Sequence, residues 1–479
     1  MNILLIYPPD RINFKAVCPP LGLAHIASVL IKEGHDVSII EVNADRYSDN
    51  QLLRIIRNYK PKPDIIGIGG IVSTYKYVKW LTNEIKTIYS GIPVVIGGSV
   101  GSSIPELILK HTPADIIVDK EGENTMLQIV TNLDGGNMDL SGVPGIFYRC
   151  GDGILHSGHR ERIRNLDTLP LPAYHLLPME IYIENVSQES FYRDVLSVSS
   201  ENRHMVLIAS RGCTDHCTFC FRQFPKVAMN SAEYVYNHIN YLHSQYGINR
   251  LTFMDELFIS SKQRTWELID VLKKLKWEID LCYRIASARV DTINIELLNA
   301  LKASGCVDIV YGLESGSQRM LDIMKKRTTV EQNRKASMLT HKSGLHTTPQ
   351  FVVGMPGETV ETLKETFRFV DSIDFWDNIG FHFANPYPGT EIYYNARKQG
   401  LIKDEDEFIS GISGTDNYPI QLADVPFKTM QRMIRFFHLR RSFRNDINRY
   451  GYIGGVLKFA SGILKKAVRK GLAWKGGRT

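Results

Sequence analysis

The chain has 479 residues, of which 43% are hydrophobic, enough for two or three separate cores. No run of eighteen uncharged apolar residues occurs, and the start MNILLIYPPD predicts a first strand rather than a signal peptide. Seven cysteines, three of them in one loop, favour a reducing, cytoplasmic compartment. The net charge of +6 is unevenly spread, because residues 427–479 hold fourteen Lys and Arg against one acid, which leaves −7 on the remainder.

The first 135 residues alternate buried strands with helices, which predicts a flavodoxin-like, doubly wound parallel α/β sheet. The expected strands are NILLIY, HDVSIIEV, PDIIGIGG, IPVVIGG and ADIIVDKEGE, and the expected helices cover 21–33, 50–58, 75–89, a stretch from 104, and 124–132. Ligands bind such sheets beyond the carboxyl ends of the strands. The residues at those ends are Ser73, Thr74, Gly97, Gly98, Glu121, Gly122 and Glu123.

Four phrases of this region carry a family resemblance. PPLGLAHIASVL, PDIIGIGG, VVIGGS and DKEGE are similar, in this order, to the cobalamin-binding domain at the front of one large class of radical S-adenosylmethionine (SAM) enzymes. The resemblance implies cobalamin at the strand ends, whereas the fold pattern by itself suits a flavin, a nucleotide or no ligand. The loop 8–20 contains no histidine, and His25 lies inside a helical pattern. We therefore expect the lower face of cobalt to lack a histidine ligand.

Residues 136–202 are rich in Gly, Pro and polar side chains and are expected to form a linker. One hairpin is predicted in GIFYRCGDGILHSG, with its turn at Gly151, Asp152 and Gly153. The phrase NLDTLPLPAYHLLP resembles the interdomain connector of the same class, and it carries no candidate for chemistry.

The stretch Ser210–Arg222, SRGCTDHCTFCFR, follows a predicted strand and holds Cys213, Cys217 and Cys220 in a C-x3-C-x2-C spacing. Three thiolates at this spacing can hold three irons of a [4Fe-4S] cluster and leave the fourth iron open. A structural zinc site with His216 as fourth ligand is the alternative, but no second ligand pair follows at a distance. The stretch resembles the radical SAM signature, which implies that SAM binds the open iron and is cleaved to a 5′-deoxyadenosyl radical.

Residues 203–390 alternate strands and helices again, which predicts a partial, TIM-type (β/α)6 barrel open on one side. The expected strands are MVLIAS, RLTFMDE, IDLCYRIA, DIVYGLE, TPQFVVG and NIGFHFA. Asp255 and Glu256 close the second strand, where side chains point into the barrel mouth. They are candidate catalytic residues that orient substrate or take a proton; a solvated pair or a helix cap is the alternative.

Four further barrel residues are candidates for binding SAM. The resemblance implies that Glu314, in YGLESG, binds the amino group, and a carboxylate suits an ammonium; a solvated Glu at a glycine-rich turn is the alternative. It also implies that Phe219 lies against the adenine and that Gly354, in FVVGMPGE, lies in a phrase with contacts near the adenine. Arg289, in SARVD, is a candidate for the SAM carboxylate or for an ion pair at the barrel rim.

Residues 391–479 form a C-terminal extension that ends in a basic amphipathic helix over 453–474. Its apolar positions are Ile453, Val456, Leu457, Ala460, Ile463, Leu464, Ala467 and Val468, and its charges are Lys458, Lys465, Lys466, Arg469 and Lys470, with Trp474 near the end. Such a helix could lie on the inner face of an anionic membrane or pack on the barrel. A nucleic-acid arm is the least favoured of the three.

Taken together, the resemblance implies a cobalamin-dependent radical SAM enzyme with a [4Fe-4S] cluster, SAM and cobalamin as cofactors. It resembles both the methyltransferases of this class and the bacteriochlorophyll cyclases. The commonest chemistry of the class is methylation of an unactivated carbon of a small-molecule, natural-product or lipid substrate, through a 5′-deoxyadenosyl radical and methylcobalamin. The resemblance also implies an electron donor such as flavodoxin or ferredoxin.

Two other functions stay open from the sequence. One is a cyclase or rearrangement enzyme that uses cobalamin without methyl transfer. The other is a cobalamin or redox sensor without catalysis. Methylthiolation is disfavoured, because the N-terminal domain has a lone cysteine, Cys18, and could not hold the second cluster which that activity requires.

Overall fold

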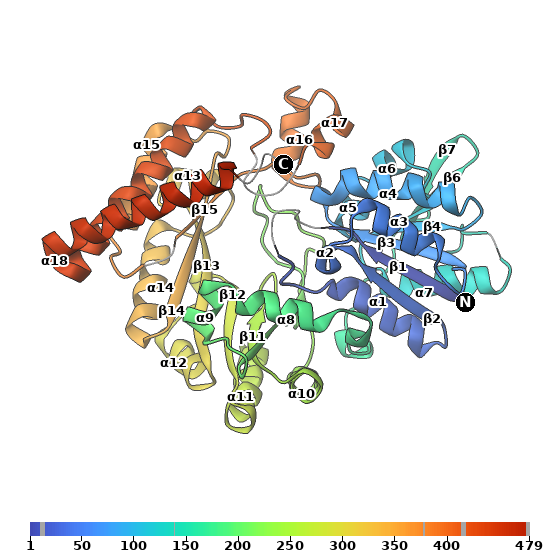
Figure 1. Cartoon of the computed structure of the whole chain (residues 1–479), viewed down its shortest axis with the longest axis horizontal. Coiled ribbons are helices and arrows are strands. Elements are labelled where there is room, and N and C mark those ends of the chain that lie inside the picture. The colour runs from blue at the N-terminus through green and yellow to red at the C-terminus, as the bar shows by residue number, and fades with distance from the viewer. Residues whose placement is uncertain (10–14, 138, 377–378, 413–417, 476–479) are drawn as a thin grey trace.

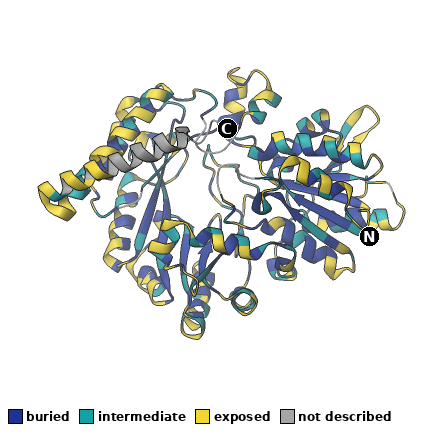
Figure 2. Ribbon diagram, viewed as in Figure 1, coloured by how far each residue is buried: buried dark blue, intermediate teal, exposed yellow. Residues whose placement is uncertain are grey.

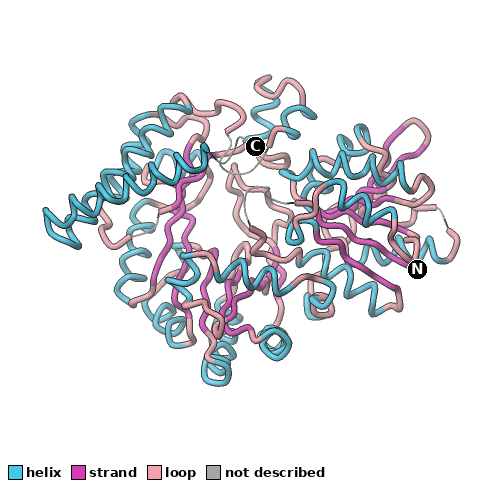
Figure 3. Tube along the Cα trace, in the orientation of Figure 1, coloured by secondary structure: helices cyan, strands magenta, loops and turns pink. Residues whose placement is uncertain are grey.

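Two sheets, one mostly parallel and one fully parallel, account with the helices around them for most of the chain (Figure 1). The computed structural model describes residues 1–9, 15–137, 139–376, 379–412 and 418–475. Loops run through the space between the two sheets (Figure 3), and the predicted functional residues lie on these loops and at the strand ends beside them. The order predicted from the sequence, a doubly wound sheet followed by a partial barrel, is confirmed.

The first sheet has the strand order β2-β1-β3-β4-β5-β6-β7. Its first five strands are parallel, as predicted: β1 Asn2–Tyr7, β2 Asp36–Glu41, β3 Ile65–Gly70, β4 Val94–Gly97 and β5 Ile116–Val118. The predicted hairpin is present as β6 Ile146–Cys150 and β7 Gly153–His156, and β6 pairs antiparallel with β5. The hairpin thus covers an edge strand that would otherwise offer unpaired backbone groups.

Helices cover both faces of this sheet because successive residues of its central strands are buried and apolar or glycine on both faces. Ile3 and Leu5 of β1 belong to the core under α1 and α7, whereas Leu4 and Ile6 belong to the core under α3, α4 and α6. The helices are α1 Leu21–Lys32, α2 Val42–Asp45, α3 Asp49–Arg57, α4 Tyr75–Ile88, α5 Gly98–Ser103, α6 Pro105–His111 and α7 Glu123–Asp134.

The second sheet has six parallel strands in the order β15-β14-β13-β12-β11-β8, so β8 and β15 are its two edges. Its strands are β8 Arg203–Leu207, β11 Ile248–Phe253, β12 Cys282–Ala288, β13 Cys306–Glu314, β14 His346–Val353 and β15 Gly380–Phe383. Its helices are α10 Ala232–Tyr246, α11 Lys262–Ile279, α12 Ile295–Ala303, α13 Gln318–Ile323, α14 Val330–Ser343 and α15 Val360–Asp371. A separate pair, β9 Ser210–Arg211 and β10 Ala228–Met229, closes the two ends of the cysteine loop.

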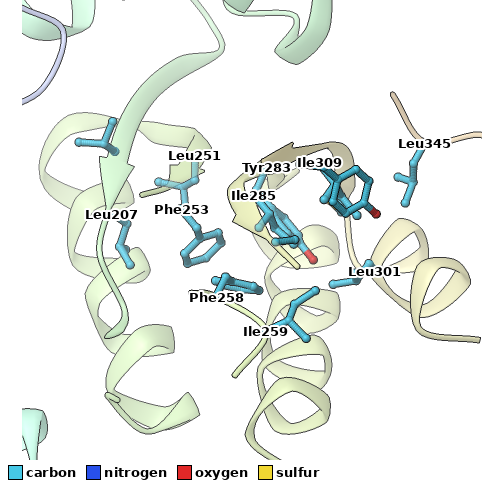
Figure 4. Close-up of a cluster of buried hydrophobic side chains, with 14 of the residues drawn as sticks. Leu207, Leu251, Phe253, Phe258, Ile259, Tyr283, Ile285, Leu301, Ile309 and Leu345 are labelled. Carbon is cyan, nitrogen blue, oxygen red and sulfur yellow. The ribbon is translucent and has the colours of Figure 1, made fainter. Parts of the chain in front are cut away.

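The barrel core lies between its strands and the outer helices. Phe253 stands at 4.7 Å from Phe258 and 5.5 Å from Tyr283, measured between ring centroids, and aliphatic side chains such as Leu251 and Ile285 surround them (Figure 4). The strands are buried along most of their length, whereas the outer helices expose one face (Figure 2). This apolar packing makes the barrel a rigid support for the loops at its mouth.

The remaining segments join the two parts. Helices α8 Met179–Ser187 and α9 Ser190–Leu196 precede the barrel, and Tyr182 of α8 is buried in a cluster that includes Ala24 and Ala44 of the N-terminal part. Beyond the barrel lie α16 Glu391–Lys398 and α17 Glu405–Ser410. Asp406 of α17 pairs with Lys79 of α4 at 2.8 Å, so the extension also contacts the first sheet's helices.

The last helix, α18 Phe427–Lys475, breaks at Gly451, where φ is +72° and ψ is 173°. Its backbone is helical over the predicted range, and Tyr452, Ile453 and Leu457 are each at least two-thirds exposed. Side chains 455, 459 and 462–475 lie outside the described residues, so the predicted positions Ile463, Leu464, Lys465, Lys466, Ala467, Val468, Arg469, Lys470 and Trp474 are not placed. In the described part of the chain, no helix is long and apolar enough to cross a bilayer.

Candidate active site

The cysteine loop closes on itself at its two ends and is tied in its middle to another segment of the barrel. Gly212 has φ of +96°, and a Cβ there would lie 2.2 Å from the carbonyl oxygen of Lys226, so only glycine fits where the loop closes. The amide of Cys213 donates to the Phe224 carbonyl at 3.4 Å, and the amide of Thr218 donates to the Met324 carbonyl at 3.0 Å. The three thiols are therefore held on a closed loop at the barrel mouth.

The donor set of this loop fits a cluster better than a single ion. Zinc–sulfur bonds of about 2.3 Å would bring neighbouring sulfurs to roughly 3.8 Å from each other. Among the described residues, the three Sγ atoms do not all lie within 4.8 Å of one another. His216, the fourth ligand of the zinc alternative, instead stands 3.5 Å from a guanidinium nitrogen of Arg222. Burial raises the pKa of Cys213 and Cys217, so bound iron must supply the charge that stabilises their thiolates.

Glu314 ends β13 beside the cysteine loop with φ of +60°. Its Oε1 accepts a hydrogen bond from Lys326 Nζ at 2.8 Å, and its side chain is 9% exposed. Burial lowers the pKa of Lys326, but the Glu314 carboxylate more than offsets this and raises it above the usual range. The structure thus places an anion, Glu314, and a cation, Lys326, next to Cys217. The sequence did not indicate Lys326 as a site residue, because nothing in the run Lys325-Lys326-Arg327 shows which of the three charges is buried.

Arg289 is engaged with carboxylates rather than free at the rim. Its guanidinium contacts Asp215 of the cysteine loop, and its Nη2 lies 2.6 Å from Asp291 Oδ2. Arg327 contacts the same Asp215, which is 7% exposed. Asp215 therefore anchors the cysteine loop to two segments of the barrel. The sequence analysis did not name Asp215, although an acidic residue between the first two cysteines is a signal from which this anchoring role could have been predicted. Binding of the SAM carboxylate by Arg289 stays a prediction.

Phe219 and Gly354 lie on one side of the loop. Phe219 is half-buried and packs against a methionine-rich cluster of Met320, Met324, Met355, Ala384 and Ile392. Gly354 donates its amide to Glu358, and its carbonyl accepts a hydrogen bond from Tyr418 Oη at 2.7 Å. Burial raises the pKa of Glu358 to about 7, and this carboxyl group holds the strand-end loop in shape. Adenine contacts by Phe219 and Gly354 stay predictions.

Asp255 and Glu256 point in different directions. Asp255 is 2% exposed, accepts hydrogen bonds from the Ser210 hydroxyl and the Ala209 amide, and burial raises its pKa to about 6. It therefore holds the start of the cysteine loop. Glu256, one residue later, is exposed into a cavity and is the member of the pair that a substrate could reach.

That cavity has a volume of about 550 Å³ and lies between the carboxyl ends of the first sheet and the mouth of the barrel. Of the predicted cofactor-binding residues, Gly97, Gly98, Glu121 and Gly122 line it. Gly98 has φ of +78°, and a Cβ there would lie 2.3 Å from the Gly70 carbonyl oxygen, so the floor is bare backbone. Ser73 and Thr74 are not in the lining, because Thr74 is turned inward and donates its hydroxyl to the Ile71 carbonyl at 2.7 Å.

The barrel contributes the opposite wall of the cavity, with Val206, Ile208, Phe224, Met254 and Glu256. Ile208 and Met254 are exposed, as is Ile71 on the other side. Exposed apolar side chains from both halves of the chain, together with a glycine floor and a few polar groups, suit a large ring that is apolar over its faces. The lining therefore fits a corrin, which would be held between the two halves of the chain.

Arg211, the last residue before the cysteine loop closes, connects the two halves. Its Nη2 lies 2.6 Å from Glu123 Oε1 and its Nη1 lies 3.3 Å from Glu121 Oε1. Glu121 also accepts the amide of Ile163 at 2.8 Å. Burial and the Arg211 charge lower the pKa of His25 to about 4, so this imidazole is neutral. His25 is the single histidine of the described lining; loop residues 10–14 lie outside the described residues, and the absence of a histidine ligand to cobalt stays a prediction.

Two family models match the chain, the B12 binding domain over residues 9–130 and the radical SAM superfamily over 207–370. An uncharacterized methyltransferase of Pyrococcus horikoshii is 34% identical over 411 residues, which cover 84% of each chain. The chain belongs to the cobalamin-binding radical SAM family. As a member of this family it uses a [4Fe-4S] cluster, SAM and cobalamin, the three cofactors predicted from the sequence.

Other members of the cobalamin-binding radical SAM family are more distant. The cytidylyl-2-hydroxyethylphosphonate methyltransferase of Streptomyces wedmorensis is 27% identical, with 84% of this chain and 83% of that one covered. The anaerobic magnesium-protoporphyrin IX monomethyl ester cyclase of Rubrivivax gelatinosus is 26% identical, with 96% of this chain and 82% of that one covered.

Two solved structures share the fold of this family member. TsrM from Kitasatospora setae, with cobalamin and a [4Fe-4S] cluster bound, gives a TM-score of 0.68 at 17% identity over 84% of this chain and 78% of that chain. OxsB, with aqua-cobalamin and SAM bound, gives a TM-score of 0.66 at 21% identity, with 90% of this chain and 60% of that chain covered. The prediction of a cobalamin-dependent radical SAM enzyme is confirmed by the family assignment.

Proposed function

We propose that this enzyme methylates an unactivated carbon of a small molecule, such as a natural product or a lipid. The observation that carries the proposal is the cavity itself, because one space is lined by the strand ends of the cobalamin domain and by the barrel strands that lead into the cysteine loop. Two of the relatives named above are methyltransferases. We assign cobalamin to residues 1–135, the linker to 136–202, the radical SAM core to 203–390 and a C-terminal extension to 391–479.

The protein's part in this reaction is binding, positioning and exclusion of water. When bound, the cluster and SAM supply a carbon-centred oxidant and cobalamin supplies a methyl group. Cys213, Cys217 and Cys220 hold the cluster, and we assign the SAM amino group to Glu314, which exchanges its contact with Lys326 for one with the ligand. Glu256 is an exposed carboxylate in the cavity lining beside the apolar side chains of Ile208 and Met254, and we assign it to orienting the substrate.

Product analysis tests the proposal. Anaerobically reconstituted enzyme with a reductant and SAM should form S-adenosylhomocysteine together with 5′-deoxyadenosine, and the variant with all three cysteines replaced by alanine should form no 5′-deoxyadenosine. Formation of 5′-deoxyadenosine with a converted substrate but without S-adenosylhomocysteine would contradict methyl transfer. If no 5′-deoxyadenosine forms with any candidate substrate class, the non-catalytic sensor replaces the proposal.

A cyclase or rearrangement reaction is the second candidate function. The cyclase relative of Rubrivivax gelatinosus covers 96% of this chain, more than either methyltransferase named above covers. The same product analysis separates the two candidates, because a cyclase consumes SAM to 5′-deoxyadenosine without transferring its methyl group.

We also propose two partners. A small electron-transfer protein such as flavodoxin or ferredoxin reduces the cluster. The basic helix after Gly451 lies on the anionic inner face of a membrane, because its described apolar side chains, Tyr452, Ile453 and Leu457 among them, are exposed rather than packed on the barrel. Anionic liposomes should pellet the full chain but not a variant truncated at Gly451. Equal pelleting of the two would remove the membrane proposal.

A further inference from the structure

A cluster of metal-ligating side chains lies on the hairpin side of the first sheet, outside the residues assigned above to cofactors. Asp119 follows β5, His156 ends β7, and His159 lies three residues further on. One ligand atom from each of the three lies within 4.8 Å of the other two, and among the described residues this is the group of three side chains with that property. The chain brings these residues together only because the β6–β7 hairpin folds back against β5.

The geometry of the cluster is partly preorganised. His159 Nδ1 lies 3.6 Å from Asp119 Oδ2, and the rings of His156 and His159 meet edge to face at 5.0 Å between centroids. The His156 ring stacks on Phe147 at 4.3 Å, which fixes its orientation. The amide of Asp119 donates to the Gly145 carbonyl at 2.9 Å, so the backbone of the third ligand is held as well.

His156 carries the second observation. Its Nε2 is buried and has no hydrogen-bond partner among the described residues, although a buried ring nitrogen without a partner is costly. Among the described residues, nothing therefore competes with a metal ion for this nitrogen.

We propose that Asp119, His156 and His159 form a binding site for a divalent transition-metal ion of the Zn²⁺ type. Two imidazoles and one carboxylate favour Zn²⁺ and its neighbours over Mg²⁺ or Ca²⁺, which prefer oxygen ligands throughout. His159 is 73% exposed, so the fourth position faces solvent and takes a water molecule. The charge of Lys120 also acts on His156 and opposes the cation, and the Asp119 carboxylate offsets it.

The bound ion would brace the path from the hairpin to the cofactor cavity. The chain leaves His159 and reaches Arg162, whose Nη2 donates to the Arg211 carbonyl at 2.7 Å, and Ile163, whose amide donates to Glu121 at 2.8 Å. Tying His159 to β5 therefore limits the motion of the segment that contacts both Arg211 and Glu121. This role is structural and independent of which reaction the cavity supports.

The test uses the holoenzyme with its cluster and cobalamin in place and Zn²⁺ as the probe. Equilibrium dialysis followed by elemental analysis should give one zinc per chain, with the iron content unchanged. His156→Ala and Asp119→Asn should each weaken zinc binding about 100-fold or more, because loss of a direct ligand costs at least as much as loss of an outer-sphere partner. His175→Gln, which alters an exposed histidine away from the cluster, is the matched control and should bind zinc like the unaltered chain.

X-ray absorption at the zinc edge completes the test, because zinc captured by the cluster cysteines would show sulfur neighbours. A shell of nitrogen and oxygen only supports the proposal, and a sulfur shell overturns it. Unchanged zinc affinity in His156→Ala and in His159→Gln, whose side chain is exposed and tolerant of replacement, also overturns it. Absence of zinc binding by the unaltered holoenzyme has the same consequence.

Discussion

Replacing Arg211 by methionine removes the cation that pairs with both Glu121 and Glu123 and so joins the cysteine loop to the acidic edge of the cobalamin domain. Its guanidinium lies 2.6 Å from the Glu123 carboxylate and 3.3 Å from the Glu121 carboxylate. Glu123 is 3% exposed and Glu121 is 8% exposed. Methionine keeps most of the side-chain volume but leaves two buried carboxylates without a counter-charge. Removing one partner of a buried ion pair costs about 3–5 kcal/mol, so we expect a loss of this size in the free energy of unfolding at neutral pH.

The loss should depend on pH. Burial raises the pKa of Glu123, but Arg211 more than offsets this and holds it below the usual value. In the unaltered chain Glu123 therefore adds stability above its unfolded pKa, and this stability is lost as pH falls through the folded pKa. Without Arg211 the folded pKa lies above the unfolded one, so Glu123 destabilises the variant at neutral pH and the penalty is relieved on acidification.

Urea unfolding of the unaltered chain and of Arg211→Met at pH 7.5 and pH 5 measures both effects, with cobalamin binding as a functional readout. The difference between the chains should be smaller at pH 5, and the double variant Arg211→Met, Glu123→Gln should recover part of the loss at pH 7.5. A loss below about 1 kcal/mol at pH 7.5, or an equal loss at both pH values without recovery in the double variant, would refute the reasoning.

Three further substitutions test the barrel side of the site. Asp215→Asn should weaken cluster binding about 10-fold to 100-fold, because Arg289 and Arg327 lose their shared anchor on the cysteine loop; iron retained per chain during titration with a chelator measures this. Glu314→Gln should raise the dissociation constant of SAM about 10-fold or more, whereas the same change at the exposed Glu391, which pairs with Lys325, should leave it unaltered. Glu358→Gln should stabilise the chain by about 3 kcal/mol at pH 8, because burial raises the pKa of Glu358 to about 7 and its charge is costly above that pH. The gain should shrink as pH falls from the folded pKa towards the unfolded one and should be close to zero at pH 4, where Glu358 is largely protonated in both states; a gain of the same size at pH 4 would contradict the assigned cause.

Short-range patterns in the sequence were sufficient for the fold, and the family resemblance carried by four phrases and the cysteine loop supplied the cofactors. Near-continuous apolar strands separated by helices predict parallel sheets wherever they occur, because both faces of such strands must be covered. The spacing of Cys213, Cys217 and Cys220 lies within one loop, so the sequence itself determines that the three thiols stand together. The same local reasoning predicted the β6–β7 hairpin from its glycine-rich turn, and it could not show that the hairpin pairs with β5.

Tertiary structure decided which of these residues face each other across the two halves of the chain. Arg211 and Glu121 are 90 residues apart and pair only when the barrel docks on the first sheet. Asp255 and Glu256 are adjacent in sequence, yet one is buried under the cysteine loop and the other faces the cavity. Asp119, His156 and His159 likewise meet only through strand pairing. Spacing along the chain specifies local geometry, whereas contacts between distant segments depend on packing that no local pattern encodes.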